Sequence, residues 1–167
     1  FIDEVGDIPL PIQVKLLRTI QFGEYQRIGS NQTEKTDVRI IAATHRNLEE
    51  MMQNGSFRED LFYRLNVVAV QLPPLRQRKE DVPILVDHFI KRYSTELEKA
   101  VSGISREALD QLMKYSFPGN IRELENVIQR AVVLSRENMV TTNDLPQLTE
   151  MKDSEKKFDP FNLDDNY

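Results

Sequence analysis

The chain begins with Phe1-Ile2-Asp3-Glu4, two apolar residues followed directly by two carboxylates. In many nucleotide hydrolases a strand ends in such a pair: the aspartate holds Mg²⁺, usually through water, and the glutamate orients or deprotonates the attacking water. Taken alone, the same string is more often a surface carboxylate pair at a strand end. Asp3 and Glu4 therefore predict either a hydrolytic metal site or a solvated strand terminus.

Two arginines lie in a short predicted helix over residues 58–65. Arg58 and Arg64 are six residues apart, which places them about 120° apart around the helix and about 9 Å along its axis. Guanidinium groups at one edge can reach a phosphate bound to a neighbouring subunit and stabilise charge on it. The alternative is pairing within the helix, because Asp60 lies four residues before Arg64.

Two further sites carry polar groups where a ligand can reach them. Thr44-His45 ends a predicted buried strand, where it either senses a phosphate or forms a strand-end turn. Arg122 lies in the first turn of a predicted helix, where a cation opposes the helix dipole unless an anion is bound nearby. His45 and His88 belong to no ligand-spaced cluster, so we expect no metal at His45 and a solvated His88.

The elements that position these groups change character near Pro74. Before it, strand and helix signals alternate; Pro11 suits a first helical turn, and Val14, Leu17 and Ile20, helped by Leu16, form the inward stripe of that helix. The predicted elements are a helix ending at 22–23, a hairpin with strands over 24–29 and 36–38, a buried parallel strand over 38–43, helices over 48–53 and 58–65, and a strand over 67–72.

After Pro74 only helical periodicity remains. The inward stripe of the first of these helices is Val82, Leu85, Val86, Phe89, Ile90, Tyr93 and Leu97. Ser105 is expected to cap a second helix with Ala108, Leu109 and Leu112 inward. Asn120 and Glu123 form a predicted capping box for a third, whose inward residues are Leu124, Val127, Ile128, Ala131 and Val132.

The predicted fold class is therefore α/β. A partial parallel-sheet subdomain covers residues 1–74, an all-helical subdomain follows over 75–148, and an acidic linker or disordered tail covers 149–167. The 167 residues carry a net charge of −5, which argues against a free nucleic-acid clamp. Without cysteine the chain has no disulfide, and no apolar run approaches the ~20 residues needed to cross a bilayer, so we expect a cytoplasmic protein without membrane contact.

Six blocks resemble one family in order and spacing. They are F-I-D-E-V-G-D-I-P, K-L-L-R, V-R-I-I-A-A-T-H-R-N-L, F-R-E-D-L-F-Y-R-L-N-V, L-P-P-L-R-Q-R-K-E-D-V-P and F-P-G-N-I-R-E-L-E-N-V-I-Q-R-A. The family is the sigma-54-dependent transcriptional activators, the NtrC-type bacterial enhancer-binding proteins, whose central domain is an AAA+ ATPase. The resemblance covers residues 1 to about 148.

The resemblance implies ATP and Mg²⁺ as cofactors, a hexameric ring, and ATP-driven remodelling of sigma-54 RNA polymerase. The implied roles are Walker B for Asp3 and Glu4, with Asp3 near the metal, sensor I for Thr44 and His45, arginine fingers for Arg58 and Arg64, and sensor II for Arg122. The chain departs from the family at three places: His45 stands where Asn is more frequent, Phe117 where Trp is commoner, and Ser30 where a second Gly is usual.

Two family motifs do not occur in the sequence, the G-x-x-x-x-G-K-[ST] phosphate loop and the GAFTGA loop that contacts sigma-54. In this family both lie upstream of Walker B, and enhancer DNA is bound by a C-terminal domain that has no counterpart after residue 148. We therefore expect the chain alone to be inactive. The alternatives are another AAA+ remodelling ATPase and a non-catalytic module that oligomerises or interferes with intact subunits through its finger face.

Overall fold

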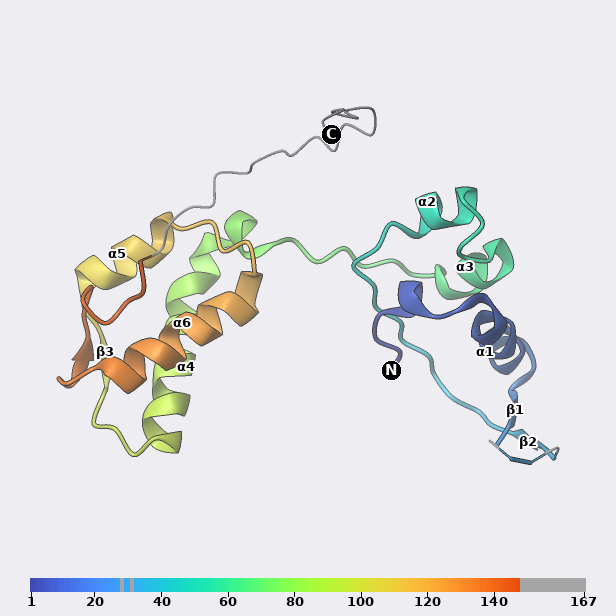
Figure 1. Cartoon of the computed structure of the whole chain (residues 1–167), viewed down its shortest axis with the longest axis horizontal. Coiled ribbons are helices and arrows are strands. Elements are labelled where there is room, and N and C mark those ends of the chain that lie inside the picture. The colour runs from blue at the N-terminus through green and yellow to red at the C-terminus, as the bar shows by residue number, and fades with distance from the viewer. Residues whose placement is uncertain (28, 31, 148–167) are drawn as a thin grey trace, which may run out of the picture. The chain divides into compact units, whose positions relative to one another are not determined.

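The computed structural model describes residues 1–27, 29, 30 and 32–147, which form two compact units (Figure 1). The first unit comprises residues 1–71, and the second begins at Leu72. The tail predicted over 149–167 lies outside the described residues. Within the described part of the chain, no helix is long and apolar enough to cross a membrane.

Four helical segments build the first unit, and each has a local reason to start or stop. They are η1 (Val5–Asp7), α1 (Leu10–Phe22), α2 (Leu48–Gln53) and α3 (Glu59–Leu65). Pro11 lies in the first turn of α1, and Gly23 ends the helix with φ 67°. The Asn47 side chain accepts hydrogen bonds from the backbone of Glu49 and Glu50 and so caps α2. The helices predicted at these places are confirmed.

One residue of the predicted inward stripe of α1 is wrong. Leu17 is buried, and Leu16 and Ile20 are half-buried, but Val14 is 38% exposed and Gln13 is completely buried. A buried amide is tolerated when its polar atoms all have partners. Gln13 meets that condition, as described below. The core of this unit consists of Val5, Leu17, Phe57, Leu61 and Phe62.

The predicted hairpin is present, with its second strand three residues earlier than expected. Strand β1 (Glu24–Gln26) pairs antiparallel with β2 (Thr33–Lys35). The Thr36 N–H still reaches the sheet end by donating to the Gly23 carbonyl over 2.7 Å. The register is therefore closed by the turn after α1.

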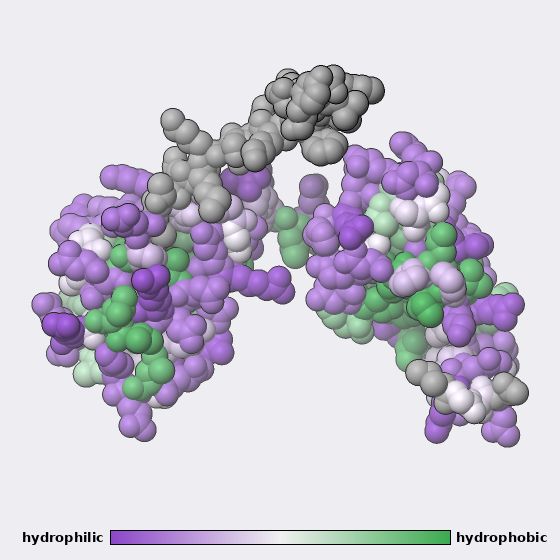
Figure 2. Space-filling view, in the orientation of Figure 1, coloured by the Kyte–Doolittle hydropathy of each residue, from purple (hydrophilic) through white to green (hydrophobic). Residues whose placement is uncertain are grey.

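The two apolar strands predicted in the first unit are largely wrong. Residues 38–43 form a single parallel bridge, between Ile2 and Ala42, and Ile41 is 56% exposed rather than buried. Residues 67–72 form no strand, and Val67 and Val68 lie in solvent. A β-strand exists only where a second backbone pairs with it, and no described residue pairs with 67–72. Figure 2 shows apolar residues at the surface of both units.

The second unit is built on three helices, α4 (Val82–Glu96), α5 (Arg106–Lys114) and α6 (Asn120–Leu134). Helix α4 packs against α6 (Figure 1). Two short 3₁₀ turns precede α4, namely η2 (Leu75–Gln77) and η3 (Lys79–Asp81). A parallel pair of two-residue strands, β3 (Gly103–Ile104) and β4 (Met139–Val140), corrects the all-helical prediction, because runs this short carry no periodic signal.

The predicted helical stripes form the core of the second unit. Leu124, Ile128 and Val132 have no exposed surface. On α4 the stripe is confirmed up to Tyr93, whereas Leu97 follows the end of the helix and is 40% exposed. The predicted helix cap at Ser105 and the solvent exposure of His88 are also confirmed.

Candidate functional site

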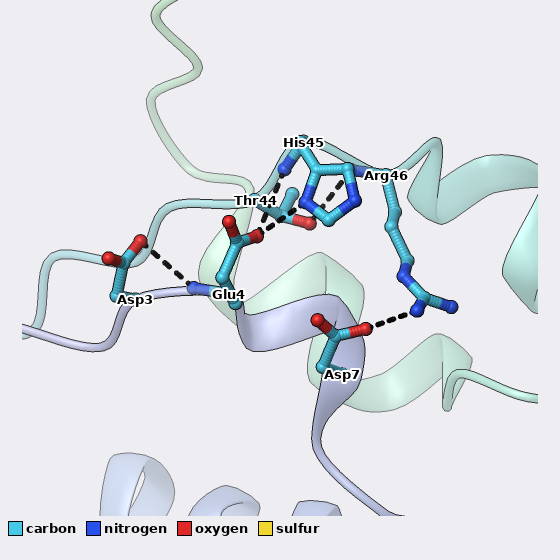
Figure 3. Close-up of polar contacts among 6 residues, drawn as sticks. All are labelled: Asp3, Glu4, Asp7, Thr44, His45 and Arg46. Atoms are coloured by element: carbon cyan, nitrogen blue, oxygen red, sulfur yellow. Dashed lines mark hydrogen bonds and ion pairs between the residues drawn. The ribbon is translucent and has the colours of Figure 1, made fainter. Parts of the chain in front are cut away.

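Two loops of the first unit bring four of the predicted residues together: Asp3, Glu4, Thr44 and His45 (Figure 3). The parallel bridge beside Ile2 sets the alignment. The Ile2 N–H donates to the carbonyl of residue 41 over 2.8 Å, and the N–H of residue 43 returns a bond of 2.9 Å to the Ile2 carbonyl.

Glu4 is held in an unusual backbone conformation at the centre of this cluster. Its φ of 50° places a non-glycine residue in the left-handed region, which is uncommon and points to a functional constraint. Its N–H donates to Asp3 Oδ1 over 3.1 Å. Its Oε2 lies 2.7 Å from His45 Nδ1 and accepts a longer bond of 3.4 Å from the His45 backbone N–H. The imidazole thereby orients the carboxylate.

The two loops are joined a second time on the other side of Glu4. Asp7 Oδ1 lies 2.5 Å from Arg46 Nη2. Between these contacts Gly6 is buried, and a Cβ added to it would stand 2.9 Å from Thr44 Oγ1 and 3.3 Å from the Arg46 Cβ. The absence of a side chain at Gly6 is what allows the loops to approach this closely. Gly6, Asp7 and Arg46 were not among the predicted site residues, since opposite charges far apart in sequence leave no local pattern.

The Thr44 hydroxyl serves the turn itself. It accepts the Arg46 N–H over 3.0 Å, so the strand-end turn considered for Thr44-His45 is present. His45, two-thirds exposed in its side chain, is the member of the pair that faces another candidate residue, namely Glu4.

Arg58 and Arg64 lie at opposite ends of α3. Arg58 is the N-cap residue, and its guanidinium binds Asp60 in a bidentate pair of 2.9 and 2.6 Å. That hydrogen-bonded pair raises the pKa of Arg58 and lowers the pKa of Asp60. The intrahelical pair expected between Asp60 and Arg64 is therefore wrong, because Asp60 turns back to the cap. Arg64 is exposed and has no ion pair with any described residue.

The start of α3 is held from below by Gln13. Its Nε2 donates to the carbonyls of Ile8 and Ser56 over 2.8 and 3.1 Å, and its Oε1 accepts the Arg58 N–H over 2.9 Å. One buried amide thus ties α1 to the segment that carries Arg58. Sequence reasoning missed it because an isolated glutamine beside an apolar stripe reads as a surface residue.

Arg122 lies in the second unit, exposed, in the first turn of α6. With Asn126 and Arg130 it lines a groove of about 660 Å³. The capping box predicted for this helix is half right. Glu123 does reach back, accepting the Gly119 N–H over 2.8 Å, but Gly119 is the N-cap and the Asn120 side chain caps nothing in α6.

Comparisons with known proteins identify the family. A model of the sigma-54 interaction domain matches residues 1–71, and one of the AAA+ ATPase lid domain matches residues 76–159. The transcriptional regulatory protein ZraR of Salmonella typhimurium is 56% identical over 146 residues, which make up 87% of this chain and 33% of ZraR. The regulatory protein AtoC of Escherichia coli is 51% identical over 145 residues, 87% of this chain and 32% of AtoC.

Solved structures agree with this match. NtrX from Brucella abortus in complex with ADP superposes with a TM-score of 0.78 and 41% identity, over 90% of this chain and 36% of NtrX. The chain spans about a third of the length of the curated relatives it matches. Sequence and fold together confirm the resemblance and the α/β AAA+ fold class. The chain belongs to the sigma-54-dependent transcriptional activators, regulators built around an AAA+ ATPase domain.

Proposed function

We propose that the intact protein is an ATPase that activates transcription by remodelling sigma-54 RNA polymerase. The observation that carries this proposal is the contact between Glu4 and His45, in which a strand-end carboxylate next to Asp3 is oriented by a group from the neighbouring loop. Family membership supports the same reading, and NtrX has been solved with ADP and with ATP.

The acidic pair suits a magnesium ion bound together with a nucleotide. Mg²⁺ keeps several waters and takes one or two carboxylates plus phosphate oxygens rather than a complete protein cage. No cluster of three or more potential metal-ligating side chains occurs among the described residues, and Asp3 is exposed, which fits that mode of binding. Asp3 would hold the ion through water, and the ion would neutralise charge on the phosphates.

Glu4 is the group that orients the attacking water and accepts its proton. His45 keeps the carboxylate in place through Nδ1, which also restrains the left-handed turn at Glu4. Because His45 is an exposed group at the end of its loop, it can also meet the terminal phosphate, as proposed for sensor I together with Thr44.

Three arginines complete the proposed site. Arg58 and Arg64 act on the nucleotide of the next subunit in a hexameric ring, where a planar cation stabilises the transferring phosphoryl group. Arg64 is exposed and unpaired among the described residues, whereas Arg58 must exchange Asp60 for phosphate. Arg122 contacts the γ-phosphate from the lid.

Part of the machinery is absent from this sequence. It contains neither a phosphate loop nor a GAFTGA motif. We therefore propose that this stretch alone hydrolyses no ATP, and that sigma-54 and enhancer DNA are bound through segments outside it.

The test is Glu4→Gln in the intact protein. We expect nucleotide binding to persist and steady-state ATP hydrolysis to disappear, because the amide keeps the shape of the side chain but cannot accept a proton. Glu49→Gln, at an exposed position of α2 in the same unit, is the matched control and should retain turnover. Wild-type turnover in Glu4→Gln would remove the catalytic assignment.

The finger assignment has a separate test. Arg64→Ala should lower hydrolysis by roughly 10³ or more, as other arginine fingers do. Mixing Arg64→Ala subunits with Glu4→Gln subunits should restore part of the activity, because some interfaces then combine an intact Glu4 with an intact Arg64 from the neighbour. No restoration in the mixture would mean that Arg64 does not act across subunits.

A second candidate function is a non-catalytic interference module. The exposed Arg64 favours it, since this chain can then present a finger face to an intact subunit without a complete site of its own. Added in excess, the chain should change the ATPase rate of the intact protein, and Arg64→Ala should abolish that effect. An unaltered rate excludes this function.

A further inference from the structure

We propose that Asn120 is a positioning residue that aims Arg122, by tying the first turn of α6 to the segment through which the chain enters the second unit. The inference rests on the proposed role of Arg122 at the γ-phosphate. It assigns to Asn120 a task different from the helix cap that its sequence position suggests.

The central contact is a hydrogen bond between residues 45 positions apart. Asn120 Oδ1 accepts the Leu75 N–H over 2.9 Å. Leu75 has no exposed surface and opens the 3₁₀ turn η2, so its N–H is one of the donors that a helix start leaves without an internal partner. The Asn120 side chain therefore satisfies a buried donor of the entry segment instead of a donor of its own helix.

The backbone around Asn120 is constrained as well. Asn120 has φ 54° and Phe117 has φ 49°, so two left-handed non-glycine residues stand within five positions of Arg122. Asparagine tolerates this region, but a bulky phenylalanine does so only when surrounding contacts hold it. Phe117 is 1% exposed and packs edge-on against Tyr115, with ring centroids 5.0 Å apart. Such conformations concentrate at functional sites.

A second anchor lies immediately after Arg122. Glu123 accepts the Gly119 N–H over 2.8 Å and the Tyr115 hydroxyl over 2.9 Å. A Cβ added to Gly119 would stand 2.8 Å from the Glu123 Cβ, so this approach requires glycine. Both polar oxygens of Glu123 are thus occupied in fixing the helix start.

Arg122 stands between these two anchors and shares neither. Its side chain is exposed at the groove and makes no ion pair with a described residue. The carboxylate nearest in sequence, Glu123, is bound elsewhere and does not neutralise it. This arrangement fixes the backbone under a cation while leaving the cation available to an anionic ligand.

The test uses three variants of the intact protein. Asn120→Gly keeps the left-handed backbone accessible but removes the acceptor for Leu75, whereas Asn120→Asp keeps an acceptor oxygen at the same place. Arg122→Ala removes the cation. We expect Asn120→Gly to lower kcat for ATP hydrolysis by about 10- to 100-fold, the scale of a misplaced catalytic group, and Asn120→Asp to stay close to wild type.

A double-mutant comparison separates aiming from stability. If Asn120 acts through Arg122, adding Asn120→Gly to Arg122→Ala causes no further loss of kcat, although it lowers Tm in both backgrounds. An equal loss of kcat in both backgrounds overturns the inference, as does normal turnover in Asn120→Gly beside an impaired Arg122→Ala. Normal turnover in Arg122→Ala overturns the proposed role of Arg122 and this inference with it.

Discussion

Gln13 offers a direct test of how the first unit holds the start of α3. Replacing it with leucine keeps a side chain of similar size in a site with no solvent exposure, but removes the hydrogen bonds to Ile8, Ser56 and Arg58. Hydrogen bonds of this kind contribute about 1 kcal/mol each to stability. We therefore expect Gln13→Leu to destabilise the first unit by about 3 kcal/mol, with the added apolar contact of leucine offsetting part of the loss.

Amide hydrogen exchange followed by mass spectrometry is the appropriate assay, because a chain of two compact units need not unfold in one step. A loss of about 3 kcal/mol raises the opening constant of the most protected amides about 10²-fold. Peptides from residues 1–71 should show this acceleration. Peptides from residues 72–147 should be unchanged and serve as an internal reference.

Gln21→Leu is the matched control, since Gln21 lies on the same helix but is exposed. It should leave exchange in the first unit nearly unaltered. The reasoning is refuted if Gln13→Leu costs no more than Gln21→Leu, or if both units lose protection equally. The first result would mean that the three bonds carry no net energy, and the second that the two units unfold together.

Three further predictions concern other parts of the chain. Leu124→Ala, at a position with no exposed surface, should destabilise the second unit by about 2–5 kcal/mol in urea unfolding. Gly6→Ala should cost about 1–3 kcal/mol in the first unit, because its methyl group meets Thr44 Oγ1 at 2.9 Å. The Arg58 pair lowers the pKa of Asp60, so its stabilisation is present above the ordinary aspartate value and is lost as pH falls through the lowered pKa. In an NMR titration, Arg58→Ala should return that pKa toward the ordinary value.

Each of these predictions has its own control or contradicting result. Val133→Ala, at a half-exposed position of the same helix as Leu124, should cost far less, and equal losses would mean that the register of α6 is wrong. Gly103→Ala adds a methyl group with nothing within 4 Å and should be nearly neutral, in contrast to Gly6→Ala. An Asp60 titration that ignores Arg58→Ala would show that the bidentate pair does not persist in solution.

Short-range signals in the sequence were enough for the helices. Pro11 and Gly23 bound α1, Asn47 and Ser105 cap α2 and α5, and apolar spacing gave the buried faces of α4 and α6. A helix closes its hydrogen bonds within four residues, so its signal is complete in a short window. The family was recognisable for a related reason, because its motif blocks are contiguous strings.

Strands and side-chain partnerships required the tertiary structure. The apolar run 67–72 reads as a strand but has no partner among the described residues, and a ladder needs two backbones. Gln13 rather than Val14 is buried, because carbonyls and an N–H distant in sequence satisfy its amide.

The candidate site divides in the same way. Residue types and motif spacing pointed to Glu4, His45 and Arg122. The fold decided that Glu4 meets His45 across 41 positions, and that Asn120 binds Leu75 instead of capping its helix. Which polar groups meet depends on where distant backbone segments cross, and local physical chemistry carries no record of that crossing.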